Sequence, residues 1–174
     1  VGLKARQLGH STGAGGYNGW DIGFHPNTEI LFLSRREDDA YELLDKAKFG
    51  WDRLPRWMAA MLPNKNSKNR QELSLDNGSK IVSLPSKSNA ARSRSARRLV
   101  ADEFAFFEEP DEAIASMRPV TEGGGQWIII STANGVGNAF ERLCMTAHEG
   151  NAVPYLFLFH PWSANPERDQ DWYD

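Results

Sequence analysis

Two uninterrupted apolar runs constrain the fold more than any other feature of this sequence. They are Glu29–Ser34 (Glu-Ile-Leu-Phe-Leu-Ser) and Gln126–Thr132 (Gln-Trp-Ile-Ile-Ile-Ser-Thr). A strand without polar alternation has to be covered on both faces, which is the situation of strands in a parallel sheet. A segment with helical spacing, Glu37–Met61, follows the first run, and Pro55 within it predicts a new turn or kink. Strands that alternate with helices predict an α/β domain built on a mainly parallel sheet.

The remaining elements follow from shorter patterns. Strands are expected at residues 2–5, 99–102 and 154–159, and helices at 111–117 and 138–148. Asn77-Gly78 separates two alternating runs and predicts a β-hairpin insertion around residues 71–85. Residues 13–19 lie where a helix should follow the first strand, but they include four glycines. Because each glycine costs about 1 kcal/mol there against alanine, that helix is expected to be short, frayed or displaced unless packing rescues it.

The first of three candidate motifs comes directly after the first strand. It partly fits the phosphate-binding loop G-x-x-x-x-G-K-[ST], in which backbone N–H groups and a lysine face the phosphates and a hydroxyl binds Mg²⁺. Gly9 and Ser11 match this pattern, whereas Lys4 stands at the first glycine and His10 at the lysine. Lys4 and Arg6 at the rim of the loop are the alternative sources of a cation. The whole segment is Lys4, Ala5, Arg6, Gln7, Leu8, Gly9, His10, Ser11 and Thr12. An ordinary strand-to-loop connection explains it equally well.

The second and third motifs are strand ends. Leu99–Ala101 is an apolar run that ends in Asp102 and Glu103, which places two carboxylates at the edge of the sheet where open α/β domains bind ligands. In nucleotide hydrolases the aspartate holds Mg²⁺ and the glutamate activates water. The run Trp127–Ile130 ends in small polar side chains suited to sensing a phosphate: Ser131, Thr132, Ala133 and Asn134. Either strand end alone is a common event, but the order and distances of all three motifs fit a P-loop NTPase-like domain.

Charge is distributed unevenly. Residues 64–98 carry nine basic and two acidic side chains, a local balance of +7, so the remaining residues carry −10 against a net charge of −3. Such a segment is typical either of a polyanion contact or of a solvated loop and hairpin. If it contacts DNA phosphates, Lys65, Lys68 and Arg70 are the candidate residues.

Size and composition exclude several classes of protein. A chain of 174 residues is the length of one domain, and no apolar run approaches the ~20 residues of a membrane span. The single cysteine, Cys144, excludes an intramolecular disulfide and a cysteine-based metal cluster, which favours a reducing compartment. The first residues enter a motif at once, so the chain is expected to have been cut from a longer one.

Together these segments resemble the ATPase domain of the large terminase subunit of tailed bacteriophages and prophages. The segments are Lys4–Thr12, Ile30–Ala40, Leu99–Phe104, Ile129–Gly137 and Pro161–Arg168. Members of that family often carry the loop lysine near the start of the loop, as Lys4 would. The resemblance implies an ATP-driven motor that moves double-stranded DNA into a prohead in the host cell cytoplasm, with no membrane contact. It also implies a homo-oligomeric ring on a portal, a small terminase subunit as partner and a nuclease domain in the full-length chain.

The resemblance also implies roles for residues. Lys4 and the loop would bind ATP, Ser11 and Asp102 would hold Mg²⁺, Glu103 would activate water, and the segment 131–134 would couple hydrolysis to movement. Arg92 matches the position of a candidate arginine finger, with phosphate-backbone contact as the rival role. The domain would occupy residues 1–160, lacking its N-terminal part, and residues 161–174 would be an exit linker toward an absent nuclease domain.

Two other functions fit the same sequence. A helicase of the Asp-Glu-box type shares the sheet and would need a second motor domain. A nucleic-acid-binding or assembly module that has lost hydrolysis would explain His10 at the lysine position and the glycine-rich helix.

Overall fold

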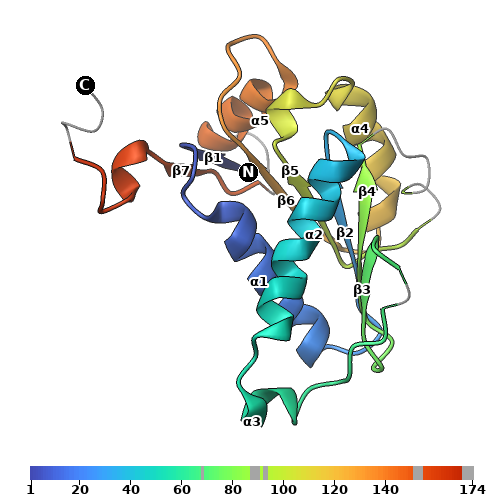
Figure 1. Cartoon of the computed structure of the whole chain (residues 1–174). Coiled ribbons are helices and arrows are strands. Elements are labelled where there is room, and N and C mark those ends of the chain that lie inside the picture. The colour runs from blue at the N-terminus through green and yellow to red at the C-terminus, as the bar shows by residue number, and fades with distance from the viewer. Residues whose placement is uncertain (68, 87–90, 92–93, 151–154, 170–174) are drawn as a thin grey trace.

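The chain folds around one seven-stranded sheet (Figure 1). The computed structural model describes residues 1–67, 69–86, 91, 94–150 and 155–169. Within them the strand order is β3-β4-β2-β5-β6-β1-β7. The strands are β1 Gly2–Lys4, β2 Glu29–Ser34, β3 Glu72–Ser74, β4 Lys80–Pro85, β5 Arg98–Asp102, β6 Gln126–Ser131 and β7 Leu158–His160. The α-helices are α1 His10–Phe24, α2 Glu37–Asp52, α3 Arg56–Ala59, α4 Pro110–Met117 and α5 Ala139–His148. Short 3₁₀ turns are η2 Phe104–Phe106, η3 Pro119–Thr121 and η4 Trp162–Ala164.

The mainly parallel α/β sheet predicted from the apolar runs is confirmed. Strand β2 pairs in parallel with both β4 and β5, and β5 pairs in parallel with β6. Helices lie on both faces, with α1 and α2 on one and α4 and α5 on the other (Figure 1). Ile30 and Phe32 of β2 join the core under α1 and α2, whereas Leu31 and Leu33 join the core on the opposite face. This double coverage explains why β2 carries no polar residue between its ends.

The predicted hairpin forms and also extends the main sheet. Strands β3 and β4 pair antiparallel, and Gly78 between them has φ +81°. Strand β4 then pairs with β2 along its whole length. The hairpin therefore supplies one edge of the sheet.

The glycine-rich helix α1 is neither short nor frayed, so packing overcomes the propensity of its residues. It runs for 15 residues, from His10 to Phe24. A Cβ atom on Gly15 would lie 3.0 Å from the backbone nitrogen of Ala47 and 3.2 Å from the carbonyl carbon of Lys46. Such distances are tighter than ordinary van der Waals contact, so the glycine lets α2 lie close to the backbone of α1. The contact with α2 compensates for the low helix propensity.

Strand β7 and the segment after it lie at the edge of the sheet opposite to β3 (Figure 1). The strand predicted at 154–159 is observed at Leu158–His160, and residue 154 lies outside the described residues. Arg168 donates to the carbonyl oxygen of Arg6 at 3.0 Å, which ties this segment to the loop after β1. The domain boundaries at 160 and 161 stay predictions. In the described part of the chain, no helix has the length and apolarity needed to cross a membrane.

Candidate functional site

The sheet brings the three predicted motifs to one edge. Strands β1, β5 and β6 are parallel and end at Lys4, Asp102 and Ser131. Strand β6 lies between the other two, and its register pairs Leu3 with Ser131 and Asp102 with Ile130. The phosphate-loop segment and the acidic pair, nearly 100 residues apart in sequence, are therefore separated in space by a single strand. This carboxyl edge is the usual ligand position in open α/β sheets.

A cavity of about 400 Å³ opens at this edge. Residues from all three motifs line it: Lys4, Arg6, Gln7, Ser11, Asp102, Glu103 and Thr132. The other predicted loop residues do not line it. The backbone N–H of Ala5 donates to the carbonyl oxygen of His160, and Leu8, Gly9 and Thr12 belong to the loop and the first turn of α1.

The side chains of Lys4, Glu103 and Thr132 meet at the cavity wall and are called the carboxyl-edge cluster below. The Nζ of Lys4 donates to Oε1 of Glu103 at 3.0 Å, and the hydroxyl of Thr132 donates to Oε2 at 3.3 Å. Lys4 is 7% exposed, but Glu103 is about one-third exposed and faces the cavity. Glu103 also has a left-handed backbone with φ 52°, which is uncommon outside glycine, asparagine and aspartate. The strand thus ends in a sharp turn that directs this carboxylate into the cavity.

The loop between β1 and α1 turns twice through left-handed backbone. Gln7 has φ 58° and Gly9 has φ 74°, and the backbone N–H of Gly13 donates to the carbonyl oxygen of Gly9 at 2.8 Å. No side chain of the described residues caps the N-terminus of α1. The first N–H groups of the helix therefore remain available as donors beside the cavity, and the helix dipole favours an anion there.

His10 occupies the lysine position of the loop pattern but points elsewhere. It lines a second cavity, of about 630 Å³, together with Val1, Gly2, residues 124–130 and residues of the last strand. Its Nε2 lies 2.8 Å from Nδ1 of His160, and its Nδ1 is buried with no hydrogen-bond partner in the described structure. Burial lowers the pKa of His10, and the charges of His160 and Lys4 act in the same direction against Asp102. His10 is therefore neutral at pH 7 and does not replace the lysine as a cation.

The strand end predicted to couple hydrolysis to movement contacts the segment that follows Glu103. The backbone N–H of Ala105 donates to the hydroxyl of Ser131 at 3.1 Å, and the side-chain amide of Asn134 donates to the carbonyl oxygen of Ala105 at 3.0 Å. Ala133 is exposed between them. The end of β6 therefore contacts the turn that follows Glu103.

The segment after β2 contributes cavity residues that the motif analysis missed. Arg35 precedes α2, and Asp39, Glu42 and Lys46 lie on α2; all four line the cavity. Arg35 and Asp39 form an ion pair of 2.6 Å. These positions are three or four residues apart and follow a strand that ends at the same edge. This helical spacing in the sequence could have predicted that they share one face toward the cavity.

The basic segment is largely occupied by internal ion pairs. Lys80 and Arg94 both pair with Glu29, Arg97 and Arg98 both pair with Asp21, and Lys65 pairs with Asp52. The guanidinium of Arg70 lies over the ring of Tyr41. Lys68 and Arg92 lie outside the described residues, so their predicted roles rest on sequence alone.

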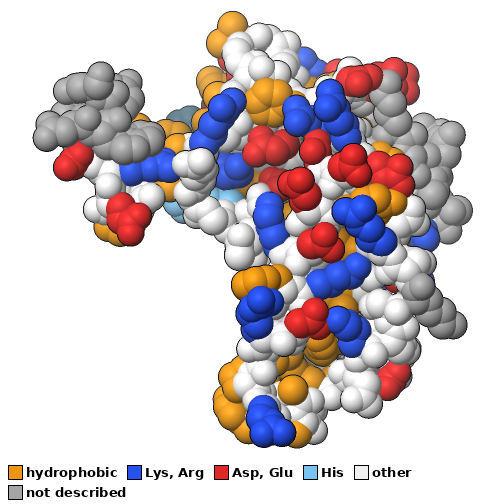
Figure 2. Space-filling model, in the orientation of Figure 1, with side chains coloured by type: hydrophobic (Ala, Val, Ile, Leu, Met, Phe, Trp, Pro, Cys, Tyr) orange, Lys and Arg blue, Asp and Glu red, His pale blue; other side chains and the backbone are white. Residues whose placement is uncertain are grey.

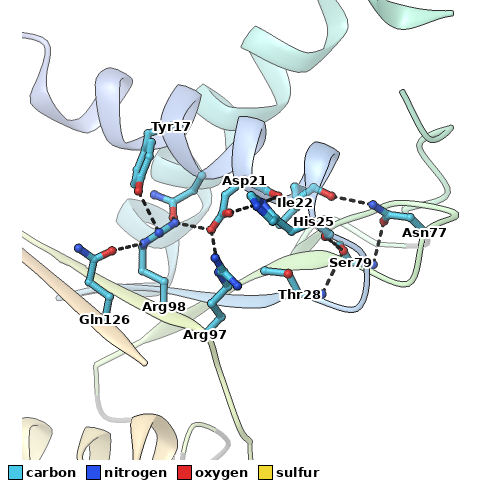
Figure 3. A network of polar contacts seen from close by, with 11 residues as sticks. Tyr17, Asp21, Ile22, His25, Thr28, Asn77, Ser79, Arg97, Arg98 and Gln126 are labelled. Atoms are coloured by element: carbon cyan, nitrogen blue, oxygen red, sulfur yellow. Dashed lines mark hydrogen bonds and ion pairs between the residues drawn. The ribbon is translucent and has the colours of Figure 1, made fainter. Parts of the chain in front are cut away.

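Arg98 is the centre of a second polar cluster, at the amino ends of β5 and β6, that is called the amino-edge cluster below (Figure 3). Its guanidinium donates to Asp21 at 2.6 Å, Asn18 at 3.1 Å, Tyr17 at 3.0 Å and Gln126 at 2.8 Å. Arg98 and Asp21 are both buried, with exposed fractions of 5% and 1%. Arg98 is thus the first residue of β5, one position before the predicted strand, and the middle of α1 binds its guanidinium.

Metal-binding groups are sparse. No group of three or more histidine, cysteine, aspartate or glutamate side chains gathers in the part of the chain that the structure describes. The Ser11 hydroxyl and the Asp102 carboxylate at the 400 Å³ cavity offer oxygen ligands of the kind that Mg²⁺ accepts alongside phosphates and water. The donor set therefore fits a magnesium–nucleotide complex rather than a metal held by protein alone.

No protein-family model matches the chain. Solved structures do match. The large terminase ATPase domain of Thermus phage P74-26 superposes with a TM-score of 0.76 and 20% identity, over 99% of this chain and 79% of that one. The large terminase of bacteriophage HK97 gives a TM-score of 0.74 and 16% identity, over 97% of this chain and 36% of that one. The large terminase of another thermophilic bacteriophage, solved with ATP-γ-S, gives a TM-score of 0.65 and 11% identity, over 98% and 41%. The chain therefore has the fold of large terminase ATPase domains.

Proposed function

We propose that this chain is the ATP-hydrolysing motor domain of a phage-type large terminase. The observation that carries the proposal is the convergence of Lys4, Ser11, Asp102 and Glu103 on one cavity at the carboxyl edge of the sheet. These residues come from two distant stretches of the chain and match the chemistry that phosphoryl transfer from ATP needs. The fold shared with terminase ATPase domains, and with a large terminase solved with ATP-γ-S, supports the same conclusion.

The cavity residues fit Mg²⁺-ATP. The N-terminus of α1, Lys4 and Arg6 would face the phosphates, and Ser11 and Asp102 would hold the metal. When bound, Mg²⁺ neutralises negative charge on the phosphate oxygens. Gly9 supports this assignment, because its φ of +74° opens the loop ahead of the helix.

Glu103 is the proposed general base. One of its carboxylate oxygens would accept the proton of the attacking water. Lys4 and Thr132 both donate to this carboxylate, which fixes its orientation. Phosphate oxygens compete with Glu103 for the Lys4 ammonium, so nucleotide entry would release Oε1 toward water. In this account the ion pair is the resting state of the site.

Coupling and DNA contact extend the proposal. The contacts of Ser131 and Asn134 with Ala105 support transmission from Glu103 to the tip of β6. Lys65, Lys68 and Arg70 remain candidates for contact with double-stranded DNA, and Arg92 remains the candidate arginine finger. The same proposal includes a ring on a portal, a small terminase subunit, a nuclease domain and a location in the host cytoplasm. These features belong to whole terminases, and the chain spans 36% of the HK97 protein and 41% of the terminase solved with ATP-γ-S.

The test is the rate of phosphate release from ATP, measured with and without double-stranded DNA. Glu103→Gln should lower the rate by about 10²–10⁴-fold, because it removes the base and keeps the shape of the side chain. Binding of ATP-γ-S should stay largely intact. Glu112→Gln, an exposed acid on α4 outside the cavity, is the matched control and should leave the rate unchanged.

Each other outcome points to a different function. An unchanged rate in Glu103→Gln would remove Glu103 from the mechanism. Nucleotide binding without hydrolysis by the wild-type protein would favour the non-hydrolysing module, which His10 at the lysine position already suggests. Unwinding of duplex DNA would favour the helicase.

A further inference from the structure

Arg6 is an exposed cation at the proposed nucleotide site, but the other cations expected there are replaced or already paired. The lysine of the loop pattern is replaced by His10, which lines a different cavity. Lys4 is buried and already paired with Glu103 at 3.0 Å. Arg35 is paired with Asp39 at 2.6 Å. A triphosphate carries several negative charges, so a further cation at this cavity would stabilise its binding.

Helix α2 brings such a cation to the cavity. Lys46 lines it together with Lys4 and Ser11, although it is more than 30 residues from either in sequence. The Lys46 ammonium makes no hydrogen bond or ion pair within the described residues, whereas Lys48 on the same helix donates to the carbonyl oxygen of Arg70 at 2.8 Å. Lys46 and Lys48 thus differ in direction, and only Lys46 faces the cavity.

The direction of the Lys46 side chain follows from helix geometry. Helices α1 and α2 each follow a parallel strand, so both begin at the carboxyl edge (Figure 1). Side chains of a helix lean toward its N-terminus, so the long stem of Lys46 extends back toward the cavity. The Cβ of Lys46 lies only 3.3 Å from where a Cβ of Gly15 would be, one turn after Ser11. The side chain therefore starts beside the first turns of α1 and leads to its N-terminus.

The glycine-rich helix explains why α2 can come so close. A methyl group at Gly15 would lie 3.0–3.3 Å from Ala47 and Lys46, tighter than ordinary van der Waals contact, so the two helices would have to shift slightly. A larger residue at position 15 would push α2 away from α1 and carry Lys46 with it. The glycine that weakens α1 as an isolated helix thus positions a lysine of the neighbouring helix.

We propose that Lys46 binds the phosphates of the nucleotide, as a lysine supplied by α2 in place of the one missing from the loop. This inference rests on the proposed function, since it assigns a further binding residue to the same cavity. The rival explanation is a solvated lysine on a charged helix face. Figure 2 shows acidic and basic side chains mixed on this face of the molecule, and Glu42 and Asp39 line the same cavity.

The experiment is equilibrium titration of the chain with Mg²⁺-ATP-γ-S. The Kd of Lys46→Met should rise about tenfold or more, the expected loss for a charge-assisted hydrogen bond to an anion. Lys46→Arg keeps the charge and should retain most of the affinity. Lys48→Met removes a lysine two positions away that points elsewhere, and its Kd should equal that of the wild type.

The outcomes separate this inference from the proposed function. If the wild type does not bind ATP-γ-S, the proposed function fails and the role of Lys46 fails with it. If the wild type binds and Lys46→Met binds equally well, Lys46 is a solvated lysine and the nucleotide site stands without it. Equal weakening in Lys46→Met and Lys48→Met would also overturn the inference, because it would report loss of surface charge only. Thermal unfolding checks that each variant is folded, and Lys46→Gln replaces Lys46→Met if the latter is not.

Discussion

Helix α1 runs between two polar clusters that differ in almost every physical respect. Its N-terminus lies beside the carboxyl-edge cluster, where Lys4, Glu103 and Thr132 border an open cavity. Its middle holds the amino-edge cluster, where Asp21 and Arg98 are almost fully buried (Figure 3). Both clusters contain an ion pair between a strand and another segment of the chain, at 3.0 Å and 2.6 Å.

The difference lies in how completely each charge is satisfied. Arg98 has four side-chain partners, and Asp21 is also approached by Arg97 and His25, so both buried charges are enclosed by partners. The carboxyl-edge cluster leaves Glu103 partly exposed, with free N–H groups of α1 and the Lys46 ammonium nearby. An ion pair that is buried and fully hydrogen-bonded stabilises the fold, whereas one that is partly exposed to a cavity can exchange a partner for a ligand.

The largest effect expected from this comparison is on stability at the amino edge. Arg98→Met leaves Asp21 buried with only Arg97 and His25, and should lower the free energy of unfolding by about 3 kcal/mol. Arg97→Met is the matched control, because Arg97 is half-exposed and 3.5 Å from Asp21, and it should lower the free energy by less than about 1 kcal/mol. Urea unfolding measures both. Equal losses in the two variants would show that the buried cluster has no special role in stability.

A smaller effect is expected from pH at the opposite end of α1. Because the pKa of His10 is lowered by burial and by His160 and Lys4, the unfolded chain takes up a proton there at a higher pH than the folded chain. The free energy of unfolding should therefore fall as pH drops from 7 through the unfolded pKa of about 6.5. His10→Asn removes this contribution and should show a shallower fall in urea unfolding at a series of pH values. A variant curve as steep as that of the wild type would mean that His10 does not carry the dependence.

Much of the fold could be predicted from the sequence because its signals are local. The apolar runs that became β2 and β6, the helix that became α2 and the Asn77-Gly78 turn each depend on residues within one element. The ends of the parallel strands at Asp102 and Ser131 then follow, since parallel strands finish at the same edge. The convergence of these ends with the loop after β1 is a consequence of sheet order.

The remaining features depend on partners far away in the chain. Arg98 counts as part of a basic segment until Asp21, 77 residues earlier, is placed beside it. The glycines of α1 suggest a weak helix until the backbone of α2 is seen against Gly15. Lys46 is an ordinary helix lysine until the strand order places it at the cavity. Local composition cannot reveal any of these contacts, because each is made by tertiary packing.

Hydrogen exchange of the whole chain with and without Mg²⁺-ATP-γ-S tests the central claim most directly. The nucleotide should slow exchange of backbone amides in two separate stretches, 5–13 and 102–106, and leave those around the amino-edge cluster, 18–25 and 97–99, unchanged. That result would show one ligand bridging the loop after β1 and the acidic strand end. Slower exchange in only one of the two stretches, or at the amino edge instead, would contradict the account.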